Sequence, residues 1–163
     1  MKCLIFLSDT SLLEEKGVIP YLNYIVSGVL ENVPIYLLVD KDCFSDYYFW
    51  KWASYPNKGI STLVSPDFNF FTEKLQYWVE KLEIRENLFL ISTTRCIDPG
   101  QIRDFILEFK KIDKLLFSKD LSLVLLSRQS LRFIVEELSS KSNLEELLYL
   151  LVSRFTYSTF SLE

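Results

Sequence analysis

The sequence predicts an α/β protein, a three-layer α/β/α sandwich built around a mostly parallel central sheet. Short apolar runs alternate along the chain with segments in which apolar residues recur every three or four positions, the patterns of buried strands and amphipathic helices. Most of the runs are apolar at consecutive positions, which is typical of strands covered on both faces. The length of 163 residues and the hydrophobic content of 49% suit one domain, residues 1–163, with a sizeable core.

The first two predicted strands enclose a predicted helix. Cys3–Leu7 is an apolar run that ends at a polar group, and Ile35–Val39 is the next such run. Between them, Pro20 opens a segment with helical apolar spacing that extends to Leu30, and proline is favoured in the first turn of a helix. This order predicts a βαβ unit, in which the two strands are parallel.

The middle of the chain repeats this alternation. Ile60–Val64 is the third predicted strand, and a helix is predicted from Ser65 to Leu82, because proline and aspartate near its start suit a first turn. The fourth strand is Leu88–Ile91. A further helix is predicted to begin at Asp98 and Pro99 and to end near two consecutive lysines.

The last third of the chain completes the predicted layers. The predicted strands are residues 114–117 and 121–126, with an edge strand at 155–162. Ser127 is the predicted cap of a helix over residues 131–138, and Asn143 is the predicted cap of a leucine-rich helix that begins at Leu144.

Polar residues follow three of the predicted strands, and in a Rossmann-like parallel sheet ligands bind beyond the carboxyl ends of the strands. The hydroxyls, carboxylates and arginine of these loops suit a polar ligand or a divalent cation. The candidate ligand-binding residues are Ser8, Asp9, Thr10, Asp40, Asp42, Thr93, Thr94, Arg95 and Asp98. The competing interpretation is that they are polar only because loops are solvated.

The segment Phe44–Tyr55 is unusually rich in aromatic residues. One interpretation is an aromatic platform for a base or sugar. Another is an exposed surface that docks a partner chain, with Tyr48, Trp50 and Trp52 as the candidate interaction residues; the leucine-rich helix Leu144–Val152 is the other candidate for such docking. The alternative, which we favour, is a helix that packs its aromatic side chains on the sheet, because each such side chain buries about 150–250 Å².

Several kinds of chemistry are excluded by composition. The sequence has no histidine, so serine triads, Cys-His dyads and histidine metal ligands are ruled out. Cys3, Cys43 and Cys96 lack the close spacing of a zinc site, and we expect no bound metal there. Scattered cysteines without a leader sequence predict reduced thiols in a cytoplasmic protein, with Cys3 in the core.

The charge balance bears on the class of partner. A net charge of −4 and a pI near 5.0 offer no basic stripe for phosphate backbones, so nucleic-acid binding is disfavoured. No apolar run approaches the length needed to span a bilayer, so no membrane span is expected.

The order of the elements resembles the nucleotidyltransferase and nucleotide-diphospho-sugar transferase superfamily over most of the chain. Leu4–Leu7 precedes the first loop, and Ile19–Leu22 lies where the family has its Lys-Pro-Leu helix start. Leu88–Ile91 leads to Ile97–Pro99, and residues 121–162 follow the order of the family's late strand and helix and its closing helix and strand. The resemblance implies the family's three-layer fold.

The functional motifs of that superfamily are eroded here. Its first loop is glycine-rich with a basic residue, because backbone amides must approach a triphosphate closely, whereas Ser8–Leu13 contains no glycine. Its metal-binding aspartate follows the fourth strand, where this chain has Ser92, Thr93 and Thr94. We therefore expect a non-catalytic interaction or scaffolding domain with a protein partner. A residual pocket would take a nucleotide or other small ligand, with Mg²⁺ as cofactor only if a nucleotide site survives.

Two alternatives remain open from the sequence. One is a Rossmann-type sensor of nucleotides or cyclic oligonucleotides, to which the small polar residues after the first and fourth strands would be suited. The other is an active Mg²⁺-dependent nucleotidyltransferase, in which Ser8, Thr10 and Arg95 would contact phosphate and Asp42 or Asp98 would contact the metal.

Overall fold

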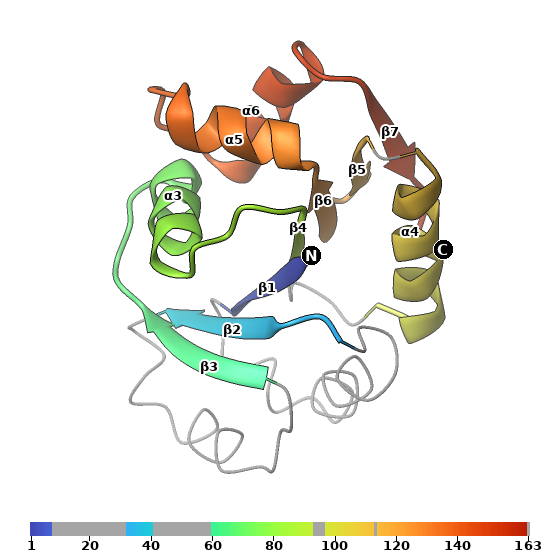
Figure 1. The fold of residues 1–163 in the computed structure, drawn as a ribbon, viewed down its shortest axis with the longest axis horizontal. Coiled ribbons are helices and arrows are strands. Elements are labelled where there is room, and N and C mark those ends of the chain that lie inside the picture. Colours follow the sequence, from blue (N-terminus) through green and yellow to red (C-terminus); the bar gives the residue numbers. More distant parts are fainter. Residues whose placement is uncertain (8–31, 41–59, 93–96, 113, 163) are drawn as a thin grey trace.

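A mixed sheet with helices on both faces organises the protein (Figure 1). The computed structural model describes residues 1–7, 32–40, 60–92, 97–112 and 114–162, and all structural statements concern these. The seven described strands are β1 (Lys2–Leu7), β2 (Ile35–Asp40), β3 (Ile60–Ser65), β4 (Leu88–Ser92), β5 (Leu115–Ser118), β6 (Leu123–Leu126) and β7 (Tyr157–Phe160). The described helices are α3 (Phe71–Lys81), α4 (Pro99–Ile112), α5 (Arg128–Glu136) and α6 (Leu144–Val152).

The strand order is β3-β2-β1-β4-β6-β5-β7. Strands β1 to β4 are mutually parallel, and β6 runs antiparallel to both β4 and β5. Strand β7 is an edge strand, as predicted for the final strand, and it pairs in parallel with β5. The prediction of a mostly parallel sheet is therefore confirmed, and the hairpin between β5 and β6 makes the sheet mixed.

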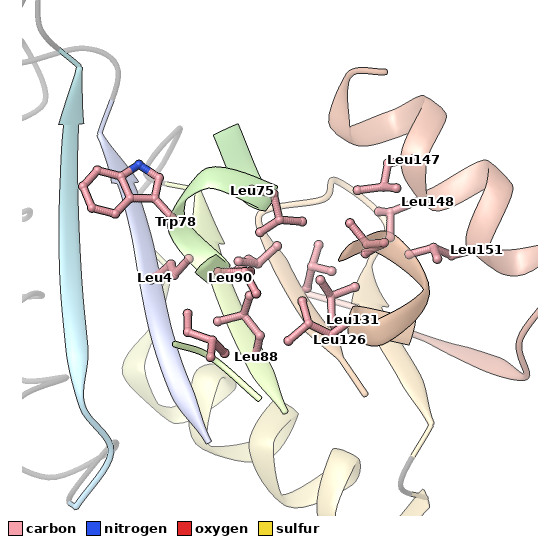
Figure 2. Packing of buried hydrophobic residues seen from close by; sticks show 14 of the residues in the cluster. Leu4, Leu75, Trp78, Leu88, Leu90, Leu126, Leu131, Leu147, Leu148 and Leu151 are labelled. Carbon is pink, nitrogen blue, oxygen red and sulfur yellow. The ribbon is translucent and has the colours of Figure 1, made fainter. Parts of the chain in front are cut away.

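Consecutive side chains of each central strand enter two different cores, one on each face of the sheet. In β1, Cys3 and Ile5 pack with the apolar stripe of α4, whereas Leu4 packs on the opposite face with α3, α5 and α6. Figure 2 shows that second core, in which Leu75 of α3 and Leu147 of α6 lie above the strands. All five side chains are fully buried. This alternation explains why the strands are apolar at consecutive positions.

The two predicted helix caps are confirmed. The Ser127 hydroxyl accepts a hydrogen bond from the amide of Ser130 at 3.3 Å. Asn143 and Glu146 form a reciprocal capping box, in which the Glu146 amide donates to the Asn143 side chain at 2.8 Å. These local bonds satisfy amides that an isolated helix start leaves unpaired.

The predicted start of the helix over Ser65–Leu82 was wrong. Ser65 is the last residue of β3, where it pairs with Asp40, and its hydroxyl accepts a hydrogen bond from the buried indole of Trp78 at 3.1 Å. The helix begins at Phe71, and the amide of Thr72 donates to the carbonyl of Ser142 at 3.1 Å. A contact from a distant segment thus replaces the expected local cap.

Other expectations have mixed outcomes. Cys3 is fully buried as predicted, and burial raises the pKa of its thiol well above the ordinary range, so it is a neutral core group. The predicted helix after Pro20 and the aromatic segment Phe44–Tyr55 lie outside the described residues. No helix in the described part of the chain combines the length and apolar character that crossing a bilayer requires.

Candidate functional site

The carboxyl edge of the parallel strands is the place where this architecture puts functional residues. Strands β1, β2, β3 and β4 all end there, and the turn between β5 and β6 reaches the same edge, because the Ser92 amide donates to the Ser122 carbonyl at 2.9 Å. Side chains from α3 and α6 close over this edge on one face of the sheet.

A small pocket of about 200 Å³ lies at this edge. Its lining comes from two strands, the β5–β6 turn and two helices, and it is apolar apart from one lysine and one serine. The lining residues are Phe6, Phe71, Lys74, Leu90, Ser92, Leu121 and Leu144. Its volume is below the roughly 300–1,000 Å³ of typical small-molecule sites.

The lysine of this pocket is held by the aspartate that ends β2. Lys74 Nζ lies 2.6 Å from Asp40 Oδ1, and the two side chains are only 15% and 32% exposed. The same ammonium lies 5.3 Å from the centre of the Phe6 ring, within the range of a cation–π contact. The predicted site residue Asp40 therefore lies beside the pocket, where its carboxylate forms an ion pair with the Lys74 ammonium.

Asp98 caps the start of α4. It precedes α4, and its Oδ1 accepts a hydrogen bond from the Gly100 amide at 3.2 Å, while its carbonyl accepts from the Gln101 amide at 2.9 Å. This is the geometry of a helix N-cap, which the sequence predicted for Asp98 as the start of this helix. Its ligand-binding role has no support from these contacts.

Solved structures of other proteins have the same arrangement of strands and helices. The chain is similar to 4-diphosphocytidyl-2C-methyl-D-erythritol synthase from Anaerococcus prevotii, with a TM-score of 0.69 and 10% identity over 99% of this chain and 86% of that one. It is similar to the inositol-1-phosphate CTP transferase from T. maritima, with a TM-score of 0.62 and 13% identity over 98% and 84%. The chain has the nucleotidyltransferase fold.

A third structure with this nucleotidyltransferase fold is a CMP:2-keto-3-deoxy-manno-octonic acid synthetase complexed with CTP, with a TM-score of 0.59 and 12% identity over 99% of this chain and 89% of that one. At such identities the likeness concerns the fold alone. No protein-family model matches the sequence, and neither does any curated protein. The resemblance inferred from element order is thus confirmed as a likeness of fold.

The β5–β6 turn adds a strained residue to this nucleotidyltransferase-fold site. Leu121 has φ of 61°, in the left-handed region that disfavours side chains. Asp120 holds the turn, since its Oδ1 accepts hydrogen bonds from the hydroxyls of Ser118 at 2.8 Å and Ser122 at 2.6 Å. In this strained conformation the Leu121 side chain forms part of the pocket wall, where a glycine would leave an opening.

The fold family implies a Mg²⁺ ion, and the described residues do not fit one. Asp40 is occupied by the Lys74 ammonium, and Asp98 by the amide of its own helix. In the ranges that the structure describes, no three acidic or cysteine side chains gather as a metal site would require. A nearby ammonium also repels a divalent cation.

Most of the predicted site residues fall in segments that the structure does not describe. Ser8, Asp9, Thr10, Asp42, Thr93, Thr94 and Arg95, and the interaction candidates Tyr48, Trp50 and Trp52, lie outside the described residues. Sequence reasoning missed Lys74, Leu121 and Leu144. Lys74 could have been found, because it interrupts the apolar stripe that Phe71, Leu75 and Trp78 form on one face of the predicted helix.

Proposed function

We propose that this chain is a nucleotidyltransferase-fold domain that binds another protein and does not catalyse nucleotidyl transfer. The observation that carries the proposal is the Lys74–Asp40 pair beside the apolar pocket at the carboxyl edge of the sheet. Phosphate transfer needs backbone amides and carboxylate-bound metal at such an edge. Among the described residues, this edge presents a carboxylate paired with an ammonium, together with apolar side chains.

The sequence next to this edge supports the same proposal. Ser8–Leu13, which follows β1, has no glycine, so side chains rather than bare backbone would face a triphosphate. Ser92 and the two threonines after it stand where the family has a metal-binding aspartate, and hydroxyls are poorer Mg²⁺ ligands than carboxylates.

A binding role is supported by the helices on one face of the sheet. Val135 of α5 is 41% exposed, and Tyr149 and Leu150 of α6 are 77% and 37% exposed. Large apolar side chains left exposed on the helix layer offer contacts that a protein partner would cover.

The test is a pyrophosphate-release assay with each nucleoside triphosphate, with and without Mg²⁺, beside a thermal-shift panel of nucleotides and nucleotide sugars. We expect no release above the protein-free rate and no shift, although a ligand at 100 times its Kd would add about 2.7 kcal/mol of stability. Mg²⁺-dependent release that is lost in Asp9→Ala or Asp98→Ala, and kept in the exposed control Asp104→Ala, would overturn the proposal.

A second candidate function is binding of a small ligand in the carboxyl-edge pocket. It is favoured by the Lys74 ammonium and the Ser92 side chain beside the rings of Phe6 and Phe71. A shift in the same thermal panel that needs no Mg²⁺ and disappears in Lys74→Met would support this candidate.

A further inference from the structure

The carboxyl-edge pocket has the size of a single aromatic ring. Its volume is about 200 Å³. An apolar cavity of roughly 150 Å³ lined by leucine and phenylalanine side chains binds benzene, whereas sites for larger ligands occupy roughly 300–1,000 Å³. The pocket therefore fits one ring with a small substituent, and a nucleotide with its base, sugar and phosphates is too large for it.

Most of the pocket lining is aromatic or aliphatic. The rings of Phe6 and Phe71 meet edge to face, with their centres 5.3 Å apart and their planes at 65°. Leu90 of β4 is 3% exposed, and Leu121 and Leu144 complete the apolar wall. Further rings pack well against such a pair, whereas the hydroxyls of a sugar would be left without partners along this wall.

Two polar side chains of the lining can bind a polar group of the ligand. The Lys74 ammonium has three N–H donors, and in the described part of the chain only Asp40 accepts from it, at 2.6 Å. The Ser92 hydroxyl makes no hydrogen bond with any other described residue. A ligand oxygen can therefore accept a hydrogen bond from either group without displacing a bond within the protein.

The charge of the pocket favours a neutral ligand. The Asp40 carboxylate already balances the Lys74 ammonium, and the two side chains are only 15% and 32% exposed. A carboxylate or phosphate in the pocket would place an uncompensated negative charge among apolar side chains and close to Asp40, which costs free energy. A cationic ligand would be repelled by Lys74.

We propose that the carboxyl-edge pocket binds a small neutral aromatic molecule with one hydrogen-bonding oxygen, of which phenol is the simplest example. The ring packs on Phe6 and Phe71, and the oxygen accepts a hydrogen bond from Lys74 or Ser92. Leu121, held at a φ of 61°, closes the wall and limits the ligand to one ring. The inference names the ligand class of the second candidate function and rests on that candidate.

Four probes test this ligand class: phenol, toluene, benzoate and naphthol. NMR titrations of the isotope-labelled full chain measure the dissociation constants and show which amide signals move. We expect phenol to bind with a Kd of about 1 mM or below and to move the signals of Ser92 and Leu121. Toluene lacks the oxygen and should bind about five- to tenfold more weakly. Benzoate is charged and naphthol has a second ring, so neither should bind.

One pair of variants tests the location. Leu144→Trp fills the pocket and should abolish phenol binding. Leu107→Trp is the matched control, because Leu107 is a 46% exposed leucine of α4 on the opposite face of the sheet, and it should leave phenol binding unchanged. Thermal unfolding of each variant shows whether the fold is retained, and the four probes on the parent chain need no variant.

A second pair of variants tests the size limit. Leu121→Gly opens the wall and should allow naphthol to bind. Its control is Glu83→Gly, because Glu83 also has a positive φ, 51°, and does not line the pocket. Glu83 ends α3, where the Ile84 amide donates to the Val79 carbonyl at 2.9 Å, the kind of helix ending in which glycine is favoured. Glu83→Gly should leave naphthol excluded.

The polar contact is tested by replacing both polar side chains of the lining. Lys74→Met combined with Ser92→Ala should remove the advantage of phenol over toluene, because neither donor remains. Toluene, which uses only the apolar lining, should bind this double variant as tightly as it binds the parent chain.

The proposal is overturned if phenol does not bind up to about 10 mM, if benzoate or naphthol binds the parent chain as tightly as phenol, or if phenol still binds folded Leu144→Trp. A nucleotide-induced thermal shift that Lys74→Met abolishes, without phenol binding, would refute this inference alone and leave the second candidate function standing. Nucleotide turnover together with phenol binding would refute the proposed lack of catalysis and leave this inference standing.

Discussion

The Lys74–Asp40 pair is the contact on which the proposed loss of catalysis depends, and its strength can be measured with Lys74→Met. Methionine keeps the apolar stem in the pocket and removes only the cation. A hydrogen bond to a charged group contributes about 1.5–3 kcal/mol, and the contact with the Phe6 ring about 0.5–1 kcal/mol. Asp40 is 32% exposed, so water can replace part of these interactions in the variant. We therefore expect Lys74→Met to lower the free energy of unfolding by about 1–2 kcal/mol.

The matched control is Lys141→Met. Lys141 also pairs with a carboxylate on α3, because its Nζ lies 3.2 Å from Glu73 Oε1. The Lys141 side chain is 66% exposed, so we expect Lys141→Met to lower the free energy of unfolding by less than about 1 kcal/mol. Urea unfolding of both variants at low and at high salt measures the difference. Salt should erase the effect at Lys141 and should leave most of the effect at Lys74.

The outcome bears directly on the site. If Lys74→Met is as stable as the parent chain, or no less stable than Lys141→Met, then the ammonium does not hold Asp40. The carboxylate would be free to take a cation, and the reasoning that leads to a non-catalytic domain would fail.

Three further predictions concern the framework around the site. Glu83→Gly should raise the free energy of unfolding by about 0.5–1 kcal/mol in chemical denaturation, since it relieves a positive φ, and a loss of stability would contradict this account of the α3 ending. Asn143→Ala should lower the free energy of unfolding by about 1 kcal/mol through loss of the capping box, whereas Asn143→Ser should retain most of it. The Cys3 thiol, neutral because burial raises its pKa, should react with a thiol reagent only as fast as the protein unfolds, and rapid labelling in native buffer would refute its burial.

The fold was predictable from local sequence patterns, because the spacing of apolar residues differs between the strands and the helices of this chain. The continuous apolar run Leu88–Ile91 and the caps at Ser127 and Asn143 each depend on neighbours within a few positions, and each was predicted correctly. The start of α3 depends instead on the carbonyl of Ser142, 70 positions from Thr72, and no local pattern contains that contact.

The candidate site was predictable only in part for the same reason. Asp40 was found because it follows an apolar run, but its partner Lys74 comes from another element, and the pairing exists only after the sheet and α3 have packed. Leu121 was missed because leucine is a rare choice at positive φ, and its position depends on the hydrogen bonds of Asp120. Residue types could identify the carboxyl edge of the sheet, but they could not identify Lys74 as the group that neutralises the Asp40 carboxylate there.

The central place of β1 has a consequence for the kinetics of folding. β1 precedes the other described strands in the sequence, and it pairs with β2 on one side and with β4 on the other, where Lys2 lies opposite Leu88. The edge of β1 that pairs with β4 stays open until β4 has left the ribosome, and contacts so distant in sequence form slowly. During synthesis this edge of an apolar strand is therefore exposed to mispairing with another chain until β4 closes the middle of the sheet.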